Sequence, residues 1–490
     1  MIEEPVATEL TLDPDDWESF RALAHRMVDD ALDEIRTIRS KPAYVPPPAA
    51  IKARILEEPV PTEPQGEEAV YNQFLTDVFP YRNGNIGPRF FGWVMGNGFP
   101  MGFMSDMLAA TMDPHMAGLN QSPRFVEEKV IDWFRELMGF PTTSSGLLLS
   151  GGSMANLTGL AVGRYVKAGF DVKDRGLWDR PMMTVYGTEE THSWAKKTVE
   201  LFGMGDQSLR RVNSHSDFTM DVDSLREAIR KDKRAGHQPI AVLATAGTVN
   251  TGATDDMNAI ADLCQEEGLW MHVDGAFGAL AAISPKLKHL VRGMERADSV
   301  AFDLHKWMYL PFEIACLLVR DGEAHHATFS NSATYLQIFD RGVVAGGIPF
   351  ADRGIELTRG FKALKAWMSI KAYGLPRFAN LIEQNVGQAQ YLASLVEAAP
   401  ELELTAPVPL NILCFRFVAS GLSLEEQNTV NQEILYRLQE RGIAVPSSTV
   451  LDGRFCIRAA LVNHRTKRED LHILVDGVIA LGQEILNERR

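Results

Sequence analysis

Cysteine is scarce in this chain, and its spacing excludes the common zinc sites. Four cysteines occur among 490 residues, namely Cys264, Cys316, Cys414 and Cys456. No two of them form a CxxC pair, and their spacing matches no usual set of zinc ligands. We therefore expect free, buried thiols in a reducing compartment, and no metal site.

Long apolar runs are also missing. No stretch of about 18 apolar residues is present that would cross a bilayer. The N-terminus carries Glu3 and Glu4, whereas a secretory signal has basic residues followed by an apolar core. We expect a cytoplasmic protein that has no membrane partner.

An excess of positive charge is absent as well. The chain has 49 Lys and Arg against 64 Asp and Glu, which gives a net charge of −15. Nucleic acids and anionic membranes bind proteins through basic surfaces, so we expect neither as a partner. A local basic pocket for a small anion is still compatible with this balance.

The order of apolar and polar residues predicts three regions. Residues 13–38 have helical spacing with Asp13 as the expected cap, and a stiff proline-rich stretch follows. We place this helical arm at 1–85, lying on the main body or reaching to a second subunit. Short strands alternate with helices over 86–375, which predicts an α/β domain with a mainly parallel sheet. A small α+β domain is expected at 376–490.

In a parallel sheet, ligand-binding residues follow the strand ends. The first such end is Gly151, Gly152 and Ser153, after the short apolar strand predicted at 147–150. A glycine turn into a helix start offers free N–H groups and a favourable dipole for a phosphate. The turn matches neither the G-x-G-x-x-G nor the Walker A pattern, so nucleotide folds gain no support. A plain turn is the ordinary alternative.

A second strand end carries a carboxylate. Asp274 directly follows an apolar strand predicted at 270–273, and the residues after it, Gly275 and Ala276, are small. A carboxylate there is unfavourable unless it meets a cation or good donors. Asp274 is therefore a helix cap, the partner of an arginine, or the partner of a protonated ring nitrogen, with Ala276 leaving room for a flat ring.

A third strand, at 299–302, is followed by His305 and Lys306. Lysine is rarely buried without a partner, so Lys306 either reaches water or forms a Schiff base, which favours a desolvated amine. Thr245 ends another strand and His192 lies near a helix start, and each has an ordinary structural alternative. A phosphate turn, a carboxylate, a ring-sized gap and an amine together predict a site for pyridoxal 5′-phosphate.

At this point the sequence resembles the pyridoxal-phosphate-dependent group II decarboxylases, which include the aromatic-L-amino-acid, glutamate and diaminobutyrate decarboxylases. The resemblance spans about residues 75–480, and six stretches carry it in family order: GPRFFGW, LLSGGSMANLTGL, THSWAKK, LATAGTVNTGA, MHVDGAFGA and LHKWMYLP. It implies a fold-type-I (aspartate aminotransferase-like) large domain. It also implies a homodimer with active sites at the interface.

The same resemblance implies a role for each candidate residue. Lys306 corresponds to the Schiff-base lysine, Asp274 to the carboxylate on the pyridine nitrogen, and His192 to the histidine stacked on the ring. The remaining implied cofactor contacts are Ala276 against the ring, the phosphate turn (Gly151, Gly152 and Ser153), and the neighbours Thr245 and His305.

Three positions depart from the family pattern. Gly87 precedes Pro88 where the family often has histidine, and Asp303 stands where it often has asparagine. The mobile catalytic loop of the family corresponds to residues 338–354. Aromatic decarboxylases carry there a tyrosine that protonates the reacting substrate, and this chain has Phe350. Because phenylalanine goes with aldehyde formation in some relatives, Phe350 is a further catalytic candidate.

The outcome of the reaction depends on how the substrate α-carboxylate is held, because the bond perpendicular to the ring is the one that breaks. Transaminases commonly clamp that carboxylate with an arginine, and Arg458 is the candidate here. We favour a surface or interface salt bridge for Arg458, because most arginines are solvated.

The sequence leaves three functions open. The first is decarboxylation of an L-amino acid to the amine and CO2. Aromatic residues within 90–99 favour an aromatic substrate, although core packing would also explain them and Arg89 would suit an acidic side chain. The second function is decarboxylation with oxidative deamination, which gives an aldehyde. The third is a non-catalytic dimer that acts as a binding protein, and the intact Lys306, Asp274 and His192 argue against it.

Overall fold

A computed structural model describes residues 10–330, 341–345 and 347–489. The chain forms two compact units. The first comprises the segment ending at Lys41 together with Val45–Arg82, and the second comprises Pro42–Tyr44 and the chain from Asn83 onward.

The first unit is helical, with α1 (Trp17–Thr37), α2 (Ala49–Leu56) and α3 (Glu67–Gln73). The predicted cap Asp13 is wrong. Asp16 caps α1 instead, because its carboxylate accepts the N–H groups of Glu18 and Ser19 at 3.0 and 3.1 Å. The prediction failed because several acidic residues precede the helix, and each of them suits the cap position.

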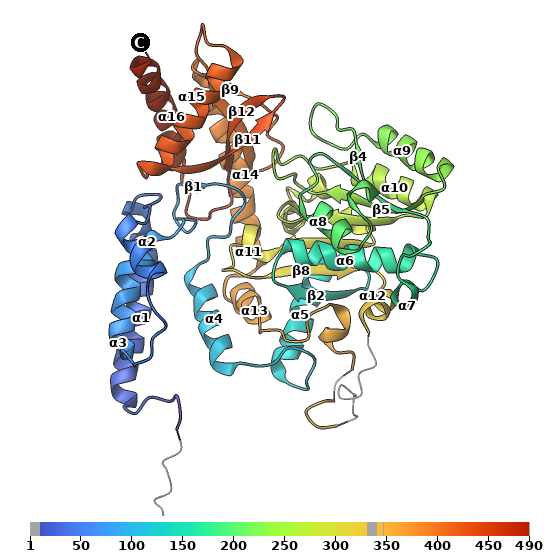
Figure 1. The fold of residues 1–490 in the computed structure, drawn as a ribbon, viewed down its shortest axis with the longest axis horizontal. Helices are drawn as coiled ribbons and strands as arrows, with labels where there is room; N and C mark the ends of the chain where they lie inside the picture. Colours follow the sequence, from blue (N-terminus) through green and yellow to red (C-terminus); the bar gives the residue numbers. More distant parts are fainter. Residues whose placement is uncertain (1–9, 331–340, 346, 490) are drawn as a thin grey trace, which may run out of the picture. The chain divides into compact units, whose positions relative to one another are not determined.

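The second unit contains a seven-stranded sheet (Figure 1) with the order β2-β8-β7-β6-β5-β3-β4. Strand β8 runs antiparallel to both of its neighbours, and the other pairs are parallel. The predicted mainly parallel α/β sheet is therefore confirmed. The strands are β2 (Ser145–Leu149), β3 (Met183–Thr188), β4 (Leu209–Val212), β5 (Gln238–Thr245), β6 (Trp270–Asp274), β7 (Ser299–Asp303) and β8 (Ala315–Val319).

Helices cover this sheet, and all five residues of β6 are buried, as expected for a strand covered on both faces. Helix α6 packs across β5 to β8. An added Cβ on Gly159 of α6 would lie 2.7 Å from the His272 ring, so glycine there permits the close approach. The α-helices between residues 100 and 373 are α4 (Pro100–Met112), α5 (Ser122–Leu137), α6 (Gly152–Lys167), α7 (Val172–Arg175), α8 (Trp194–Leu201), α9 (Val222–Arg234), α10 (Met257–Glu267), α11 (Leu304–Trp307), α12 (Gly322–Phe329) and α13 (Ala363–Tyr373).

A smaller five-stranded sheet has the order β1-β11-β12-β10-β9. Its first strand, β1 (Phe90–Phe91), pairs in parallel with β11, so a short segment from the start of the predicted large domain joins the C-terminal sheet. The division at residues 85 and 375 stays a prediction. The other elements are α14 (Leu375–Ala398), β9 (Leu402–Leu404), β10 (Ile412–Phe417), α15 (Leu424–Glu440), β11 (Val445–Leu451), β12 (Arg454–Ala460) and α16 (Arg468–Glu488).

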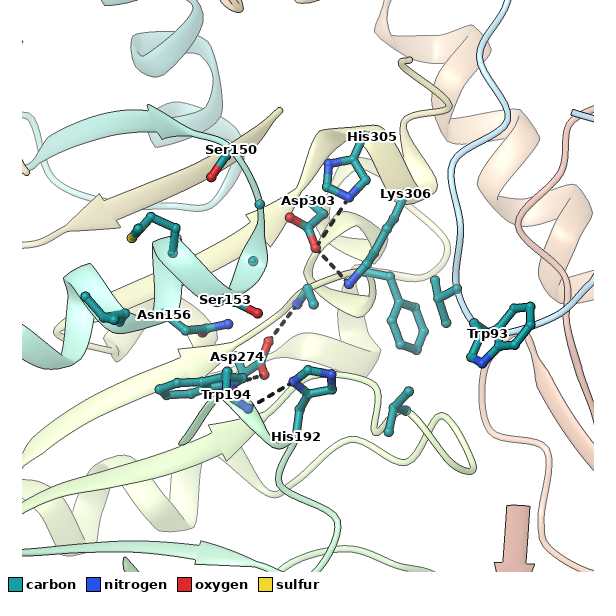
Figure 2. A pocket seen from close by; sticks show the side chains of 18 of the residues that line it. Trp93, Ser150, Ser153, Asn156, His192, Trp194, Asp274, Asp303, His305 and Lys306 are labelled. Carbon is teal, nitrogen blue, oxygen red and sulfur yellow. Dashed lines mark hydrogen bonds and ion pairs between the residues drawn. The ribbon is translucent and has the colours of Figure 1, made fainter. Parts of the chain in front are cut away.

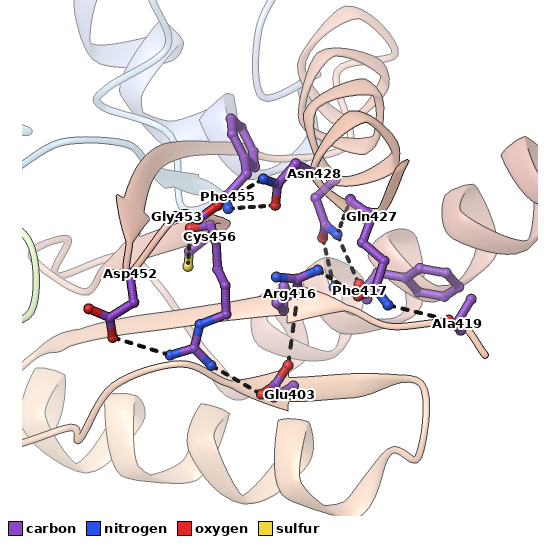
Figure 3. A network of polar contacts seen from close by, with 12 residues as sticks. Glu403, Arg416, Phe417, Ala419, Gln427, Asn428, Asp452, Gly453, Phe455 and Cys456 are labelled. Atoms are coloured by element: carbon purple, nitrogen blue, oxygen red, sulfur yellow. Dashed lines mark hydrogen bonds and ion pairs between the residues drawn. The ribbon is translucent and has the colours of Figure 1, made fainter. Parts of the chain in front are cut away.

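A buried polar network ties the small sheet to α15 (Figure 3). Arg416 of β10 is 2% exposed, donates to Gln427 Oε1 at 2.5 Å and lies 4.0 Å from Glu403. Asn431 of α15 accepts the N–H of Phe417 at 2.7 Å and donates to its carbonyl at 2.9 Å. These contacts satisfy polar groups that would otherwise be buried alone.

Over the described ranges, every helix is too short or too polar to cross a membrane.

Three histidines, of which His272 and His325 are buried and His464 is half-buried, predict how stability depends on pH. Burial lowers the pKa of His272 to about 4, of His325 to about 3 and of His464 to about 4, whereas an unfolded histidine titrates at about 6.5. Below that pH the unfolded chain binds protons that the folded chain does not, so stability falls as the pH falls. We expect the free energy of unfolding in urea to decrease by about 3 kcal/mol between pH 6 and pH 5.

His272 offers the sharpest control for this prediction. Its ring is fully buried and bonds Ser299 Oγ at 2.8 Å and Asn156 Oδ1 at 2.7 Å. The variant His272→Gln should remove about one third of the slope. His215→Gln, at an exposed position, should leave the slope unchanged. Equal slopes in His272→Gln and the wild type would contradict the assignment.

Candidate active site

One cavity of about 730 Å³ opens where β5, β6 and β7 end and α6 begins. Register pairs Thr245 with Asp274 and Asp274 with Ala301, so three neighbouring strand ends meet at this edge. Figure 2 shows the Lys306 and Asp274 side chains pointing into the same space, with Trp93 at its far edge. All nine predicted cofactor contacts line the cavity, namely Gly151, Gly152, Ser153, His192, Thr245, Asp274, Ala276, His305 and Lys306.

The glycine turn opens helix α6 at the wall of the cavity. Gly151 is the N-cap and no side chain caps this helix start, so its first N–H groups are available to an anion. A Cβ on Gly152 would lie 2.8 Å from Asp303 Oδ2, so only glycine fits between the helix and that carboxylate. Ser153 is on the cavity side of the same turn.

The Asp274 carboxylate is fixed by two donors. Trp194 Nε1 donates to Oδ2 at 2.6 Å, and the Ala276 N–H donates to Oδ1 at 3.1 Å. Asp274 is 5% exposed and has no arginine or lysine partner among the described residues. The alternative of a buried ion pair with arginine is therefore wrong. The carboxylate keeps lone pairs free for a cationic ligand group in the cavity.

The Lys306 amine meets a second carboxylate. Its Nζ lies 2.7 Å from Asp303 Oδ2, and its side chain is 23% exposed. Asp303 itself is 1% exposed, and its Oδ1 has no hydrogen-bond partner within the described part of the chain. This geometry explains how an amine is tolerated between apolar segments, because the charge is paired and still reaches the cavity.

Two histidines flank these groups. Loss of surrounding water lowers the pKa of His192, against an opposing contribution from Asp274, and the Lys306 charge lowers it further. His305 Nδ1 bonds the Ile314 carbonyl at 2.9 Å, and burial likewise lowers its pKa. Both imidazoles are therefore neutral at pH 7 and can stack on or bond a ligand without adding charge.

These residues fit pyridoxal 5′-phosphate. An uncapped helix start suits its phosphate, Asp274 suits its ring nitrogen, and Lys306 provides the amine that tethers its aldehyde. Ala276 lines the cavity, and its small side chain leaves room for a flat ring.

Two predicted residues lie elsewhere. Phe350 is 1% exposed, its ring contacts the guanidinium groups of Arg353 and Arg359, and it does not line the cavity. Its catalytic role stays a prediction, and residues 338–340 and 346 of the proposed loop lie outside the described residues. The salt bridge expected for Arg458 is wrong, because this side chain is 3% exposed and bonds backbone carbonyls and a hydroxyl.

Two residues at the site had no role in the sequence interpretation. Trp194, within the stretch THSWAKK, holds Asp274, and its position two residues after His192 was the available signal. Asp303 was noted only as a departure from the family pattern, yet it holds the Lys306 amine.

Comparison with known proteins agrees with this geometry. Residues 48–418 match the model of the pyridoxal-dependent decarboxylase conserved domain. The chain is 31% identical to the aromatic-L-amino-acid decarboxylase of Bacillus atrophaeus, over 96% of both chains. It is 28% identical to the phenylacetaldehyde synthase of Petunia hybrida, over 93% of this chain and 92% of that protein.

Solved structures share the fold. The crystal structure of Oryza sativa TDC with PLP and tryptamine superimposes with a TM-score of 0.89 at 25% identity, covering 97% of this chain and all of that one (100%). Mouse CSAD gives a TM-score of 0.89 at 25% identity, covering 95% and 99%. With Lys306 and Asp274 lining one cavity, these matches establish that the chain belongs to the pyridoxal-dependent decarboxylase family and is a pyridoxal-phosphate-dependent amino-acid decarboxylase.

Proposed function

We propose that this protein decarboxylates an aromatic L-amino acid to the corresponding amine and CO2. The observation that carries the proposal is the composition of the cavity, which is lined by Lys306, Asp274 and the indole-bearing Trp93. Trp93 is 52% exposed, so its indole is available to a flat substrate side chain. The Bacillus atrophaeus relative, named for aromatic amino acids, supports the same substrate class.

Each of the predicted site residues has a defined task in this proposed reaction. The bound cofactor supplies an electron-accepting ring that receives the electrons of the broken bond. The α6 turn would hold the phosphate, Asp274 would keep the ring nitrogen protonated, and neutral His192 would contact the ring. Asp303 holds the Lys306 amine as an ion pair when the lysine is free of the cofactor.

The cavity also favours loss of the carboxylate. No arginine is among the described residues that line it, and its lysines are Lys197 and Lys306. A carboxylate without a bidentate arginine partner is less stabilised in the ground state, and only differential stabilisation of the transition state accelerates a reaction. This arrangement supports decarboxylation over transamination.

A panel of L-amino acids tests the proposal. We expect CO2 and amine in equal amounts, with kcat/KM at least about tenfold higher for phenylalanine, tyrosine, DOPA or tryptophan than for glutamate or aspartate, because an apolar indole contact favours an aromatic ring. A preference for an acidic substrate would overturn the substrate class and leave decarboxylation intact.

We further propose a cytoplasmic homodimer with active sites at the interface. Helix α1 exposes Trp17, Phe20 and Leu32 at 58%, 37% and 40%, which supports a partner surface on this arm. The four cysteines are free and buried, in keeping with a reducing compartment. Sedimentation equilibrium tests the dimer, and a concentration-independent monomer would exclude it.

Aldehyde formation is the second candidate, and Phe350 is the observation that favours it. That route takes up O2 and water and releases CO2, ammonia and hydrogen peroxide with the aldehyde. If the wild type makes aldehyde, we expect Phe350→Tyr to raise the ratio of amine to aldehyde at least about tenfold, because a phenol can donate a proton where a phenyl ring cannot. Quantifying amine, ammonia and peroxide together measures this ratio.

Phe361→Tyr is the matched control for this prediction. Phe361 is another buried phenylalanine that does not line the cavity, so its variant should leave the product ratio unchanged. An unchanged ratio in Phe350→Tyr would show that this residue does not select the product.

A further inference from the structure

Trp93 has a backbone conformation that its own side chain disfavours. Its φ is 51°, in the left-handed region where bulky residues are rare. The conformation turns the indole to the cavity wall, where it is 52% exposed. Strain of this kind persists only when surrounding groups enforce it.

Two residues of the small sheet enforce it. The Trp93 N–H donates to Ser447 Oγ at 3.1 Å, and Arg458 Nη1 donates to the Trp93 carbonyl at 3.0 Å. Arg458 Nη1 also donates to Ser447 Oγ at 3.1 Å, and the two residues are register partners on β11 and β12. Both backbone groups of Trp93 are therefore held by one rigid pair.

Arg458 reaches a second wall of the same cavity. Its Nε donates to the Asn250 carbonyl at 3.2 Å, and Asn250 Nδ2 donates to Glu190 Oε2 at 3.0 Å. Glu190 lines the cavity beyond His192. A single guanidinium thus fixes the Trp93 wall directly and the Glu190 wall through Asn250.

The surroundings of Arg458 favour a positioning role over a role as a carboxylate clamp. Arg458 is 3% exposed, does not line the cavity and has no carboxylate partner in the described ranges. Its Nε and Nη1 make the bonds described above, and its Nη2 is buried with no hydrogen-bond partner among the described residues. A lysine could not replace its planar fork, which bonds two separate carbonyls at once.

We propose that Arg458 is a positioning residue that sets substrate specificity by holding Trp93 against the aromatic side chain of the substrate. This inference rests on the proposed function and extends it, because it assigns recognition of the ring to a residue that never touches the substrate. The alternative is direct binding of the α-carboxylate by Arg458. The amine product distinguishes these two roles, because it retains the aromatic ring and lacks the carboxylate. Only a positioning role predicts that an Arg458 variant binds the amine more weakly.

The test measures 2-phenylethylamine as an inhibitor of the loaded enzyme, beside KM for the best aromatic substrate. In Arg458→Met we expect KM and the inhibition constant of the amine to rise together, each about tenfold, because both ligands lose the indole contact. The visible absorbance and the affinity of the bound cofactor should stay unchanged. A rise in KM with an unchanged amine constant would overturn the proposal in favour of a carboxylate clamp.

Ser447→Ala tests the proposal independently, should the arginine variant fail to fold. It removes the acceptor for the Trp93 N–H and leaves Arg458 in place, so we expect both constants to rise about threefold. Ser448→Ala, at the exposed neighbour on β11, is the matched control and should change neither constant. In a Trp93→Gly background, Ser447→Ala should add no further loss, and an additive loss would overturn the proposal. A wild type that neither turns over aromatic amino acids nor binds the amine would instead refute the proposed function.

Discussion

Replacing Lys306 by alanine is expected to abolish covalent retention of the cofactor and to lower kcat/KM at least about a thousandfold, as expected when an amine nucleophile is removed. After borohydride reduction and denaturation, the wild type should carry the cofactor on the peptide that contains Lys306. The variant should carry none on any peptide, which mass spectrometry measures directly.

Stability must be separated from chemistry in this variant. Removal of Lys306 leaves the Asp303 carboxylate buried without its ion partner, and breaking such a pair destabilises a protein by about 3 kcal/mol. The double variant Lys306→Ala, Asp303→Asn removes the unpaired charge. We expect it to regain part of the lost free energy of unfolding and to stay unlabelled.

Lys197 is the matched control, because it is the other lysine that lines the cavity. Lys197→Ala should keep the covalent label on Lys306. Label found on another lysine in the Lys306 variant would show that the tether was assigned to the wrong residue.

The sequence was sufficient to predict the cofactor cavity because its chemistry is local to the strand ends. Thr245, Asp274 and Asp303 each close an apolar strand, and parallel register brings such ends to one edge. The nine predicted contacts meet at one cavity for this reason. Their roles in binding stay predictions that the variants above and below test.

The surroundings of Arg458 could not be predicted in the same way. The guanidinium meets the Trp93 carbonyl across 365 residues of sequence and the Asn250 carbonyl across 208. These contacts depend on β1 joining β11, a two-residue strand pairing that no periodic pattern indicates. The antiparallel direction of β8 could not be predicted, because a buried strand has the same apolar pattern whether it runs parallel or antiparallel to its neighbours.

Replacing Asp274 by alanine is expected to lower kcat/KM at least about a hundredfold, because the proposed task of the buried carboxylate is to stabilise positive charge on the cofactor ring. It also removes the acceptor of the Trp194 indole N–H, whose bond to Oδ2 is 2.6 Å long. We therefore expect weaker cofactor affinity as well, measured by equilibrium dialysis. Asp232→Asn, at a buried aspartate that binds Arg210 and Tyr186 away from the cavity, should not change that affinity.

An analogue of the cofactor with CH in place of the ring nitrogen separates the two effects of Asp274. In the wild type, the analogue should lower kcat/KM by about the same factor as the alanine variant does with the natural cofactor, because either change removes the charged pair. In Asp274→Ala, exchanging the natural cofactor for the analogue should add little further loss. If the two losses multiply instead, Asp274 does not act through the ring nitrogen, and its carboxylate serves only to hold Trp194 and the turn at Ala276.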